Sequence, residues 1–260
     1  MNGKYNKDIY YQPPEVDTNN YGKPPKKKTW IIVLIIIAVL LVIKGVLSVY
    51  GSVAYNIIRH TCADDTLLAG TQSEQSFAAD DVKNMSIDWA EGDISIKYCK
   101  DENITVKENS NENAGTMVCT LYNDGGLTID YIDTNIENAH LINAKKDLTI
   151  TVPYGTELSE IKISAFGSDV SMHDIVCSEF DYSTIGGDGS FSFKTQPEII
   201  RLDSVSGDIS LGFSDNFSGY SLNTSAVSGK IKDKIRDSGD GSTEIKFISV
   251  SGDLELYKAK

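Results

Sequence analysis

The sequence predicts an all-β protein built as a β-solenoid or β-helix-like stack of coils of about 20 residues, preceded by one transmembrane α-helix. Two observations indicate the solenoid. A Ser-x-Ser-Gly-Asp turn recurs in the C-terminal half, most plainly at 204–208 and 249–253, and short strands with apolar residues at every second position flank its copies. The helix is indicated by fourteen consecutive apolar residues from Trp30 to Ile43.

The apolar block is long enough to cross a membrane only when it is taken from residue 29 to residue 50. The fourteen apolar residues alone extend about 21 Å as a helix, whereas residues 29–50 extend about 33 Å, and a hydrocarbon core is about 30 Å thick. Lys44 is expected to direct its charged end toward the headgroups. The alternative is a signal peptide cleaved near residues 52–54, but the acids and prolines before the block are unlike a short basic leader.

The residues before the block set the predicted orientation. Residues 1–28 carry six lysines and three acids, and four of the lysines stand close to the block. Because positive flanks stay inside, we expect a single-pass cell-membrane protein with a cytoplasmic N-terminus and an extracytoplasmic C-terminal domain. Membrane lipid is then the partner of residues 29–50, and the Asn-, Lys- and Pro-rich tail at 1–28 is predicted to be disordered.

From residue 51 onward the sequence divides into a neck and a strand-rich domain. Residues 51–80 have no sustained apolar period and are predicted to form a stalk or neck. The extracytoplasmic β-strand-repeat domain is predicted at 81–260, where period-two alternation begins at 85–87 and continues at 94–96. Up to Tyr131 this alternation is compatible with a meander or with part of a β-sandwich.

The repeat proper begins after the strand at 148–153. Its turns recur at intervals of 19, 20, 22 and 23 residues, at Ser168, Gly187, Gly207, Gly229 and Gly252. This is a solenoid period, in which a coil buries its apolar side only by stacking on its neighbours. Glycine is explained at the turns by a left-handed or otherwise strained backbone, which has no steric cost for Gly. These repeat-turn glycines are Gly92, Gly187, Gly207, Gly229 and Gly252. Ser and Thr beside the turns suit hydroxyls that bond to the neighbouring coil.

Several segments of the sequence resemble a known family. They are the strand at 148–153, the Ser-x-Ser-Gly-Asp-x-x-Leu copies at 204–211 and 249–256, and the segments 85–87 and 92–96. It is the bacterial putative-adhesin family of membrane-anchored β-strand-repeat envelope proteins, and the resemblance covers about 82–257. It implies a single-sheeted or flattened β-solenoid outside the membrane, without an agreed enzymatic role and with envelope-stress signalling in some relatives. Two copies depart from the motif, which argues against a ligand site that takes one Asp from every coil. They are at 166–169 and 229–230.

The four cysteines lie on the predicted outer side, where disulfides are permitted. Cys99 ends one strand and Cys119 lies in the next long strand, so a disulfide between them is plausible. Cys62 and Cys177 would then join the neck to the first coil. Four cysteines allow three pairings, and buried unpaired thiols are the alternative.

The candidate metal-binding or catalytic residues form a single set, a row of aspartates. In a regular solenoid their positions would be about 4.8 Å apart, so the row could bind calcium or host acid/base chemistry like that of β-helical polysaccharide lyases. Its members are Asp169, Asp188, Asp208 and Asp253. The favoured alternative is that each Asp caps its own turn. The sequence contains neither a Gly-x-Ser-x-Gly elbow nor zinc-ligand spacing, so no catalytic residue, metal or cofactor is assigned.

Net charge narrows the expected partners. Residues 51–260 carry seventeen Lys and Arg and thirty-four Asp and Glu, a net charge of −17. Such a surface repels nucleic acid but is compatible with a cationic peptide. We therefore expect a cell-surface protein that is not an enzyme, whose adhesin-like domain binds or scaffolds an envelope protein, a glycan or a cationic peptide. An envelope-stress sensor acting through a partner membrane protein is the alternative, and a polysaccharide-active enzyme ranks last.

Overall fold

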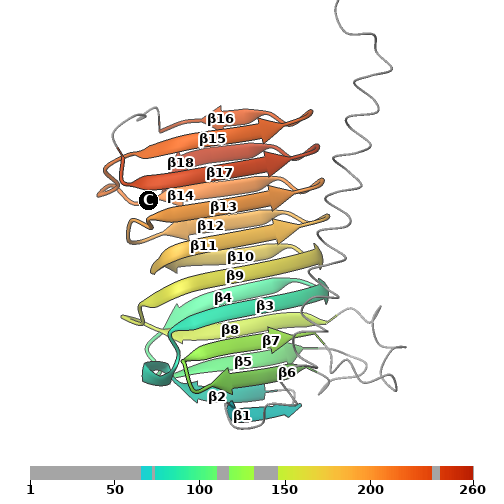
Figure 1. Cartoon of the computed structure of the whole chain (residues 1–260), viewed down its shortest axis with the longest axis vertical. Helices are drawn as coiled ribbons and strands as arrows, with labels where there is room; N and C mark the ends of the chain where they lie inside the picture. Colours follow the sequence, from blue (N-terminus) through green and yellow to red (C-terminus); the bar gives the residue numbers. More distant parts are fainter. Residues whose placement is uncertain (1–65, 72–73, 110–116, 132–145, 236–240, 260) are drawn as a thin grey trace, which may run out of the picture.

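The computed structural model describes residues 66–71, 74–109, 117–131, 146–235 and 241–259. Within them the chain forms two nine-stranded sheets that face each other along one long stack (Figure 1). Each coil contributes one strand to each sheet, so the predicted all-β solenoid is confirmed. The transmembrane helix predicted at 29–50 lies outside these residues, and no helix within them is long and apolar enough to span a membrane.

The first sheet contains, in spatial order, β1 (Thr66–Thr71), β6 (Val118–Tyr122), β7 (Gly126–Asp130), β3 (Asn84–Glu91), β9 (Leu158–Gly167), β11 (Cys177–Thr184), β13 (Ile199–Ser204), β17 (Thr243–Ser249) and β15 (Tyr220–Ala226). The second sheet contains β2 (Glu74–Ala78), β5 (Asn103–Asn109), β8 (Asp147–Pro153), β4 (Ile94–Cys99), β10 (Val170–Ile175), β12 (Gly189–Phe193), β14 (Ile209–Phe213), β18 (Leu254–Lys258) and β16 (Ile231–Asp233). A short 3-10 helix, η3 (Ala79–Asp81), follows β2.

Most neighbouring strands run parallel, as expected when successive coils wind in the same direction. Antiparallel pairs occur near one end of the stack, where β6 pairs with β1 and β7, and β5 pairs with β2 and β8. The segment before residue 131 is therefore neither a free meander nor a separate sandwich. Its strands belong to the same two sheets and form the lower part of the stack in Figure 1.

Part of the predicted neck belongs to the folded domain. β1 and β2 both lie within residues 51–80, where β1 pairs with β6 and β2 pairs with β5. Gln75 and Phe77 are buried, and Phe77 joins the core with 3% of its surface exposed. The prediction of a neck was therefore wrong for these strands. The sequence pattern did not reveal this strand because β2 is short: it has only five residues, and only two of their side chains are turned inward.

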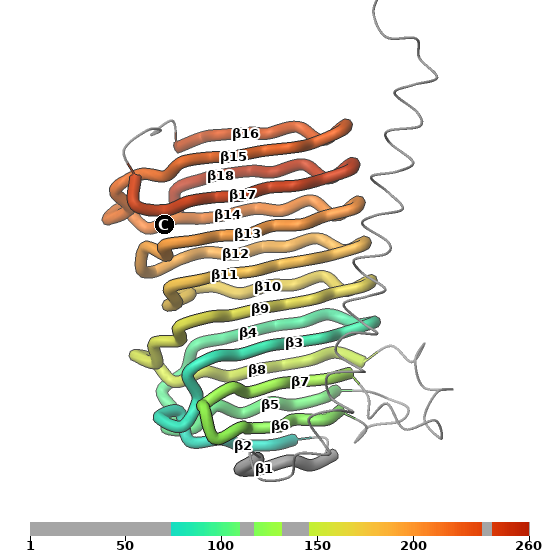
Figure 2. Tube along the Cα trace, viewed as in Figure 1, coloured from blue at the N-terminus to red at the C-terminus, as the bar shows by residue number. Residues whose placement is uncertain are grey.

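The coils at the C-terminal end are not stacked in sequence order. β17 pairs with both β13 and β15, and β18 pairs with both β14 and β16. The last coil of the chain therefore lies between two earlier ones, as the red tube between two orange coils in Figure 2 shows. Ile245 and Phe247 of β17 are 0% exposed and require a neighbour on each side, whereas residues 223–226 of β15 are exposed and suit the end of the stack.

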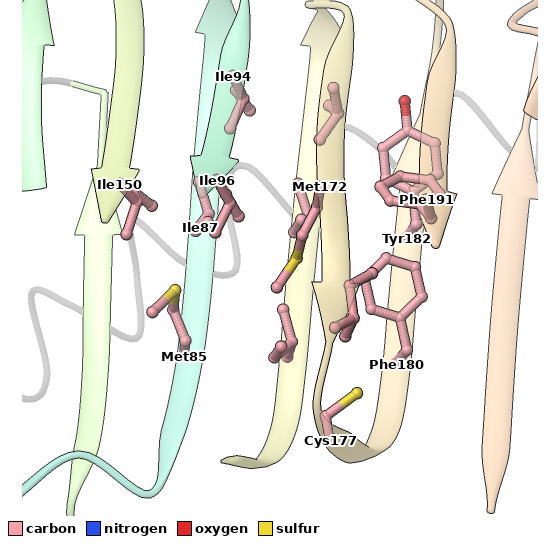
Figure 3. Close-up of a cluster of buried hydrophobic side chains, with 14 of the residues drawn as sticks. Met85, Ile87, Ile94, Ile96, Ile150, Met172, Cys177, Phe180, Tyr182 and Phe191 are labelled. Atoms are coloured by element: carbon pink, nitrogen blue, oxygen red, sulfur yellow. The ribbon is translucent and has the colours of Figure 1, made fainter. Parts of the chain in front are cut away.

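The core is a set of apolar rows between the two sheets. Figure 3 shows Met85 and Ile87 of β3 and Ile94 and Ile96 of β4 among the buried side chains, and each of these strands turns alternate side chains inward. Aromatic rings continue the row in the next coils, where the Phe180 and Phe191 rings meet edge to face with centroids 4.8 Å apart. The inner coils thus bury their apolar side chains against their neighbours, which makes the stack one continuous core.

Candidate functional site

The four predicted aspartates lie in one row at the edge where each coil passes from the first sheet to the second. The backbone N–H of Asp188 donates to the carboxylate of Asp169 at 2.8 Å, and that of Asp208 donates to Asp188 at 2.9 Å. The N–H of Asp253 donates to Asp208 at 2.8 Å, because the coil of Asp253 lies next to the coil of Asp208. Each of these carboxylates caps an amide of the neighbouring coil and not, as the favoured alternative held, an amide of its own turn.

Two further aspartates extend the row toward the lower coils of Figure 1. The N–H of Asp93 donates to the carboxylate of Asp147 at 2.9 Å. Asp93 lies beside Asp169 in the stack, since the N–H of Ile94 donates to the carbonyl oxygen of Asp169 at 2.8 Å. The Gly92-Asp93 pair repeats the turn dipeptide of the later coils and could have placed Asp93 from sequence, whereas no comparable signal precedes Asp147.

The row ends at Lys230, which stands where the other turns have Asp. Its N–H donates to the carboxylate of Asp253 at 2.8 Å, and the Nζ of Lys232 lies 3.4 Å from the same carboxylate. The amide of Lys230, and then Lys232, hold the pKa of Asp253 below its ordinary value. Among the described residues, no group of three or more His, Cys, Asp or Glu side chains is arranged to hold a metal ion. What the geometry assigns to the row is capping of backbone amides.

The turn glycines have two different physical roles. Gly92 and Gly187 have φ of +103° and +127°, the left-handed backbone predicted from the sequence. Gly207, Gly229 and Gly252 do not share this backbone, but a Cβ atom there would lie 1.9–2.0 Å from a carbonyl oxygen of the adjoining coil. The left-handed explanation was therefore wrong for these three, which are needed because neighbouring coils approach too closely for any side chain.

Hydroxyls beside the turns bond to backbone within and between coils. The Oγ of Ser204 accepts from the N–H of Gly207 at 2.9 Å and donates to the carbonyl of Gly207 at 2.8 Å. The Oγ of Ser206 donates to the carbonyl of Ile185 in the neighbouring coil at 3.0 Å. The expectation that these hydroxyls would reach the adjacent coil holds for Ser206.

A row of small hydroxyl side chains crosses the outer face of the second sheet. They stand directly opposite one another on five adjacent parallel strands and are all half-buried. This row, the hydroxyl row, contains in spatial order Thr149, Ser95, Ser171, Ser190 and Ser210. Because adjacent strands are about 4.8 Å apart, it forms a regular array of donors and acceptors on a flat surface. No single motif predicts it, since its members come from five separate strands.

The outer face of the first sheet carries ion pairs instead. Arg201 of β13 reaches two carboxylates of the neighbouring strand β11, Glu179 at 3.0 Å and Asp181 at 2.9 Å. Hydrogen bonds to Asp181 and Glu179 raise the pKa of Arg201 above its ordinary value. These groups are about one-third exposed, so the cluster ties two coils together at the surface.

A β-bulge in β10 brings His173 and Ser192 together. Asp174 has φ of +59°, and the register with β12 shifts between Met172 and Ile175. The Nδ1 of His173 lies 3.3 Å from the Oγ of Ser192, which also accepts from the N–H of Asp174 at 3.3 Å. The contact holds the bulge in place. A nucleophilic serine would also need a carboxylate behind the imidazole, and no described hydrogen bond of His173 supplies one.

Cys99, Cys119 and Cys177 are free thiols, so the predicted Cys99–Cys119 disulfide is wrong. Cys99 ends β4 in the second sheet and Cys119 lies in β6 of the first sheet, so nearness in sequence does not make them neighbours in space. Burial raises the pKa of both Cys119 and Cys177 to about 12, which keeps these thiols protonated and inert. Cys62, the predicted partner of Cys177, lies outside the described residues.

A buried ion pair that sequence reasoning missed lies beside the lower coils. Lys146 and Glu108 are both 0% exposed, and the Nζ of Lys146 lies 3.6 Å from the Oε2 of Glu108. The same Nζ donates to the carbonyl oxygen of Tyr131. It lies 4.0 Å from the ring centroid of Tyr131 and 5.2 Å from that of Trp89. Neither residue stands in a repeat, so no pattern in the sequence marks the pair.

The surroundings of this pair perturb the ionisation of Lys146. Burial lowers the pKa of Lys146 to about 8, and Glu108 partly offsets that effect. The N–H of Met117 donates to the Oε2 of Glu108 at 2.8 Å. The Oε1 of Glu108 and the hydroxyl of Tyr131 are buried without a hydrogen-bond partner among the described residues. Such buried polar atoms are costly and call for an explanation.

Comparisons with known proteins agree with this architecture. Residues 82–211 match the family model described as Toastrack DUF4097, and no curated protein matches the chain. A putative cell adhesion protein from Clostridium sporogenes is 11% identical with a TM-score of 0.57, over 72% of this chain and 99% of that one. A putative adhesin from Bacteroides fragilis is 12% identical with a TM-score of 0.34, over 70% and 95%. The first of these likenesses extends to the fold. Because the family match spans half of the sequence, the chain belongs to the Toastrack DUF4097 family.

Proposed function

We propose that the chain is a membrane-anchored cell-surface protein whose β-solenoid acts as a binding or scaffolding module. The observation that supports this proposal most directly is the hydroxyl row, a flat array held in register by five parallel strands. Rigid strands present such an array without ordering it on binding, which lowers the entropy cost of association. A solved structure that shares this fold is that of a putative cell adhesion protein, in agreement with the proposal.

The chemistry of the row favours an extended polar partner. Each hydroxyl can both donate and accept a hydrogen bond, as glycan hydroxyls and peptide backbone also do. A repeating chain laid across the strands would meet an equivalent group at every coil, so weak contacts would add along its length. We therefore favour an envelope glycan as the partner. A cationic peptide, which the net charge of −17 in residues 51–260 would attract, is the alternative ligand.

The experiment places bulk on one sheet face at a time. Cells that produce the full chain are tested for binding to purified envelope glycans, with Ser171→Arg/Ser190→Arg as the variant of the hydroxyl row. The matched control is Ser164→Arg/Ser183→Arg, which changes the paired serines of the same two coils on the opposite sheet. We expect the first variant to weaken binding at least about tenfold, or about 1.4 kcal/mol, and the control to leave it unchanged. Equal binding by both variants and the wild type would refute the proposed face.

A sensor of envelope stress is the second candidate, and the predicted cytoplasmic tail favours it. Residues 1–28 contain four tyrosines and six lysines that a partner membrane protein could contact. Deletion of residues 1–28 separates the two functions, since signalling through the tail would stop while adhesion through the solenoid would continue. Loss of adhesion in this variant, with the protein still at the surface, would contradict a purely adhesive role.

A further inference from the structure

We propose that the buried side chains of Lys146 and Glu108 become joined by an intramolecular amide bond, so that the folded chain carries a covalent cross-link between β5 and the residue before β8. Four observations support the bond: the 3.6 Å separation of Nζ and Oε2, the complete burial of both side chains, the two aromatic rings around Nζ, and the backbone N–H on Oε2. The inference is independent of what the solenoid binds.

Burial supplies the driving force. Two ions removed from water are costly unless every charge and lone pair is satisfied. Here the Oε1 of Glu108 is buried without a hydrogen-bond partner among the described residues, so the ionised carboxylate is incompletely compensated. An amide bond would replace both charges with one neutral group. Water, which would be needed to hydrolyse that bond again, is kept away by the packing that makes both side chains 0% exposed.

Proximity lowers the barrier. Reacting groups held about 3–3.5 Å apart behave as if at effective concentrations of about 10⁵–10⁸ M. The Nζ of Lys146 is close to this range from a carboxyl oxygen of Glu108. A lysine amine is activated as a nucleophile by desolvation in an apolar pocket, because the uncharged form becomes more populated. Burial has this effect on Lys146, whose pKa it lowers to about 8.

The reaction balances without any co-reactant. A proton passes from the ammonium of Lys146 to the carboxylate of Glu108, which leaves an uncharged amine and a carboxylic acid. The nitrogen then attacks the carboxyl carbon, so a C–N bond forms and one C–O bond breaks. A proton from the nitrogen joins the departing hydroxyl and leaves as water. The ion pair is thereby converted to an amide and one water molecule, and nothing is oxidised or reduced.

Neighbouring groups are placed to assist each stage. The N–H of Met117 donates to Oε2 of Glu108 at 2.8 Å and would stabilise the negative charge that develops on that oxygen during attack. The carbonyl of Tyr131 accepts a hydrogen bond from Nζ and orients the amine. The N–H of the Trp89 ring donates to the carbonyl oxygen of Lys146 at 2.8 Å and fixes its backbone. We assign these three as positioning groups.

The bond would close residues 109–145 into a covalent loop that contains β6 and β7. β1 pairs with β6, and the predicted membrane anchor precedes β1 in the chain. Tension transmitted from the anchor would reach β1 and, through its pairing with β6, the strands inside this loop. A covalent closure would prevent them from unravelling beyond residues 108 and 146, which is useful for a surface protein under load.

Peptide mapping of the full chain under denaturing conditions tests the proposal. We expect one branched peptide that joins the segments containing Glu108 and Lys146 and that is lighter than their sum by one water molecule. Internal controls are the exposed pairs Lys107–Glu74 at 3.4 Å and Lys246–Glu244 at 3.1 Å, which lie closer together but about half in solvent. They should remain unlinked, because water solvates their charges.

The Lys146→Arg variant keeps a cation beside Glu108 but removes the primary amine, and its digest should contain the two segments only as separate peptides. The decisive reading is made on the wild-type chain, so a variant that fails to fold does not affect the test. Separate, unmodified peptides from wild-type protein that has been purified folded would overturn the proposal. A branched peptide at the exposed pairs as well would also overturn it, since burial would then not be the cause.

Discussion

Gly186 and Gly252 are both glycines of repeat turns, yet the space around them differs. A Cβ at Gly186 would meet only the Oγ of Ser206, at an ordinary 3.5 Å. At Gly252, the equivalent of Gly187 in a later coil, a Cβ would lie 2.0 Å from the carbonyl oxygen of Gly207. The backbone of two coils would have to separate to admit it. Glycine in the turn motif is therefore required by the close approach of neighbouring coils as much as by the backbone conformation of the turn.

This difference predicts unequal effects of two alanine substitutions. Gly252→Ala should lower the free energy of unfolding by about 1–3 kcal/mol, the range for an overpacked core, because backbone has to move. Gly186→Ala should change it by less than about 0.5 kcal/mol. Denaturant unfolding followed by circular dichroism compares them. Similar midpoints for the two variants would show that the coils can separate without cost.

The pKa of Asp253 predicts how the top of the stack responds to acid. Because the amide of Lys230 and the side chain of Lys232 lower this pKa in the folded state, the carboxylate contributes stability above its unfolded pKa of about 3.9. That contribution disappears as the pH falls through the folded value. Asp253→Asn keeps an oxygen to accept from Lys230 but lacks the charge. Its stability should therefore fall less steeply than that of the wild type when the pH is lowered below about 5. Parallel stability profiles from pH 7 to pH 3 would contradict this assignment.

Repeated residues were easier to predict than isolated ones. Asp188, Asp208 and Asp253 share one motif, and the structure brings them into one row as expected. The amide that each carboxylate caps belongs to another coil, and a motif within one coil does not contain that information. Lys146 and Glu108 belong to no repeat, and their meeting depends on antiparallel pairing of β5 with β8. Their burial therefore became visible only with the fold.

At the scale of strands, the position of each coil follows from how many of its faces are apolar. Coil β17–β18 contributes four apolar side chains that are 0% exposed, namely Ile245, Phe247, Leu254 and Leu256. In coil β15–β16 only Tyr220 is buried to that degree, and Ile231 remains 39% exposed. The sequence defined the coils and their spacing correctly, but turn spacing alone could not reveal that the last two are exchanged in space. The polar character of β15 is the signal that could have done so.

The exchange predicts that the outermost coil can be removed without disturbing the rest. Deletion of residues 216–240 would join β14 to β17 through a connection of four residues, close in length to the natural connection from β12 to β13. Since β17 and β18 already pair with β13 and β14, hydrogen-exchange protection of β13 and β14 should be retained. Truncation at residue 242 removes the interior coil instead and should reduce this protection. Equal loss in the two variants would mean that β15–β16 supports the whole end.

Lysines also protect the sheet edge at this end of the stack. β16 forms the edge of the second sheet, and it is flanked by Lys230 and Lys234 with Lys232 at its centre. Alternating lysines oppose pairing with a strand of another molecule, because their charges would have to be desolvated. The end of the stack is thus suited to solvent and the faces remain as the surfaces for contact.

At the scale of the whole molecule, the predicted topology and the described thiols give one joint prediction. In intact cells that produce a Cys62→Ser variant, a membrane-impermeant thiol reagent at about pH 8 should label half-buried Cys99. Cys119 and Cys177, with pKa values of about 12, should be labelled only after denaturation. Deletion of residues 29–50 should in addition release the protein from the membrane fraction.

Peptide mapping after labelling distinguishes the outcomes. Labelling of Cys99 only after the cells are lysed would place the domain on the inner side and contradict the predicted orientation. A Cys99–Cys119 linked peptide would contradict the separation of these residues in two sheets. Retention of the deletion variant on washed membranes would show that another part of the chain holds it there.

The insertion of coil β17–β18 has a consequence for biosynthesis. A ribosome makes β15 and β16 before the strands that separate them from β13 and β14, so this end of the stack cannot reach its final order until β17 and β18 have emerged. A chain that stops early would leave β14 uncovered, or covered by the wrong coil. The N–H of Ala259, just after β18, donates to the carbonyl of Phe213 at 2.9 Å, so the segment that follows β18 also contacts the end of β14. The order of the coils at this end is therefore set only after β17 and β18 have been made, and a chain interrupted before them would expose β14 to proteolysis.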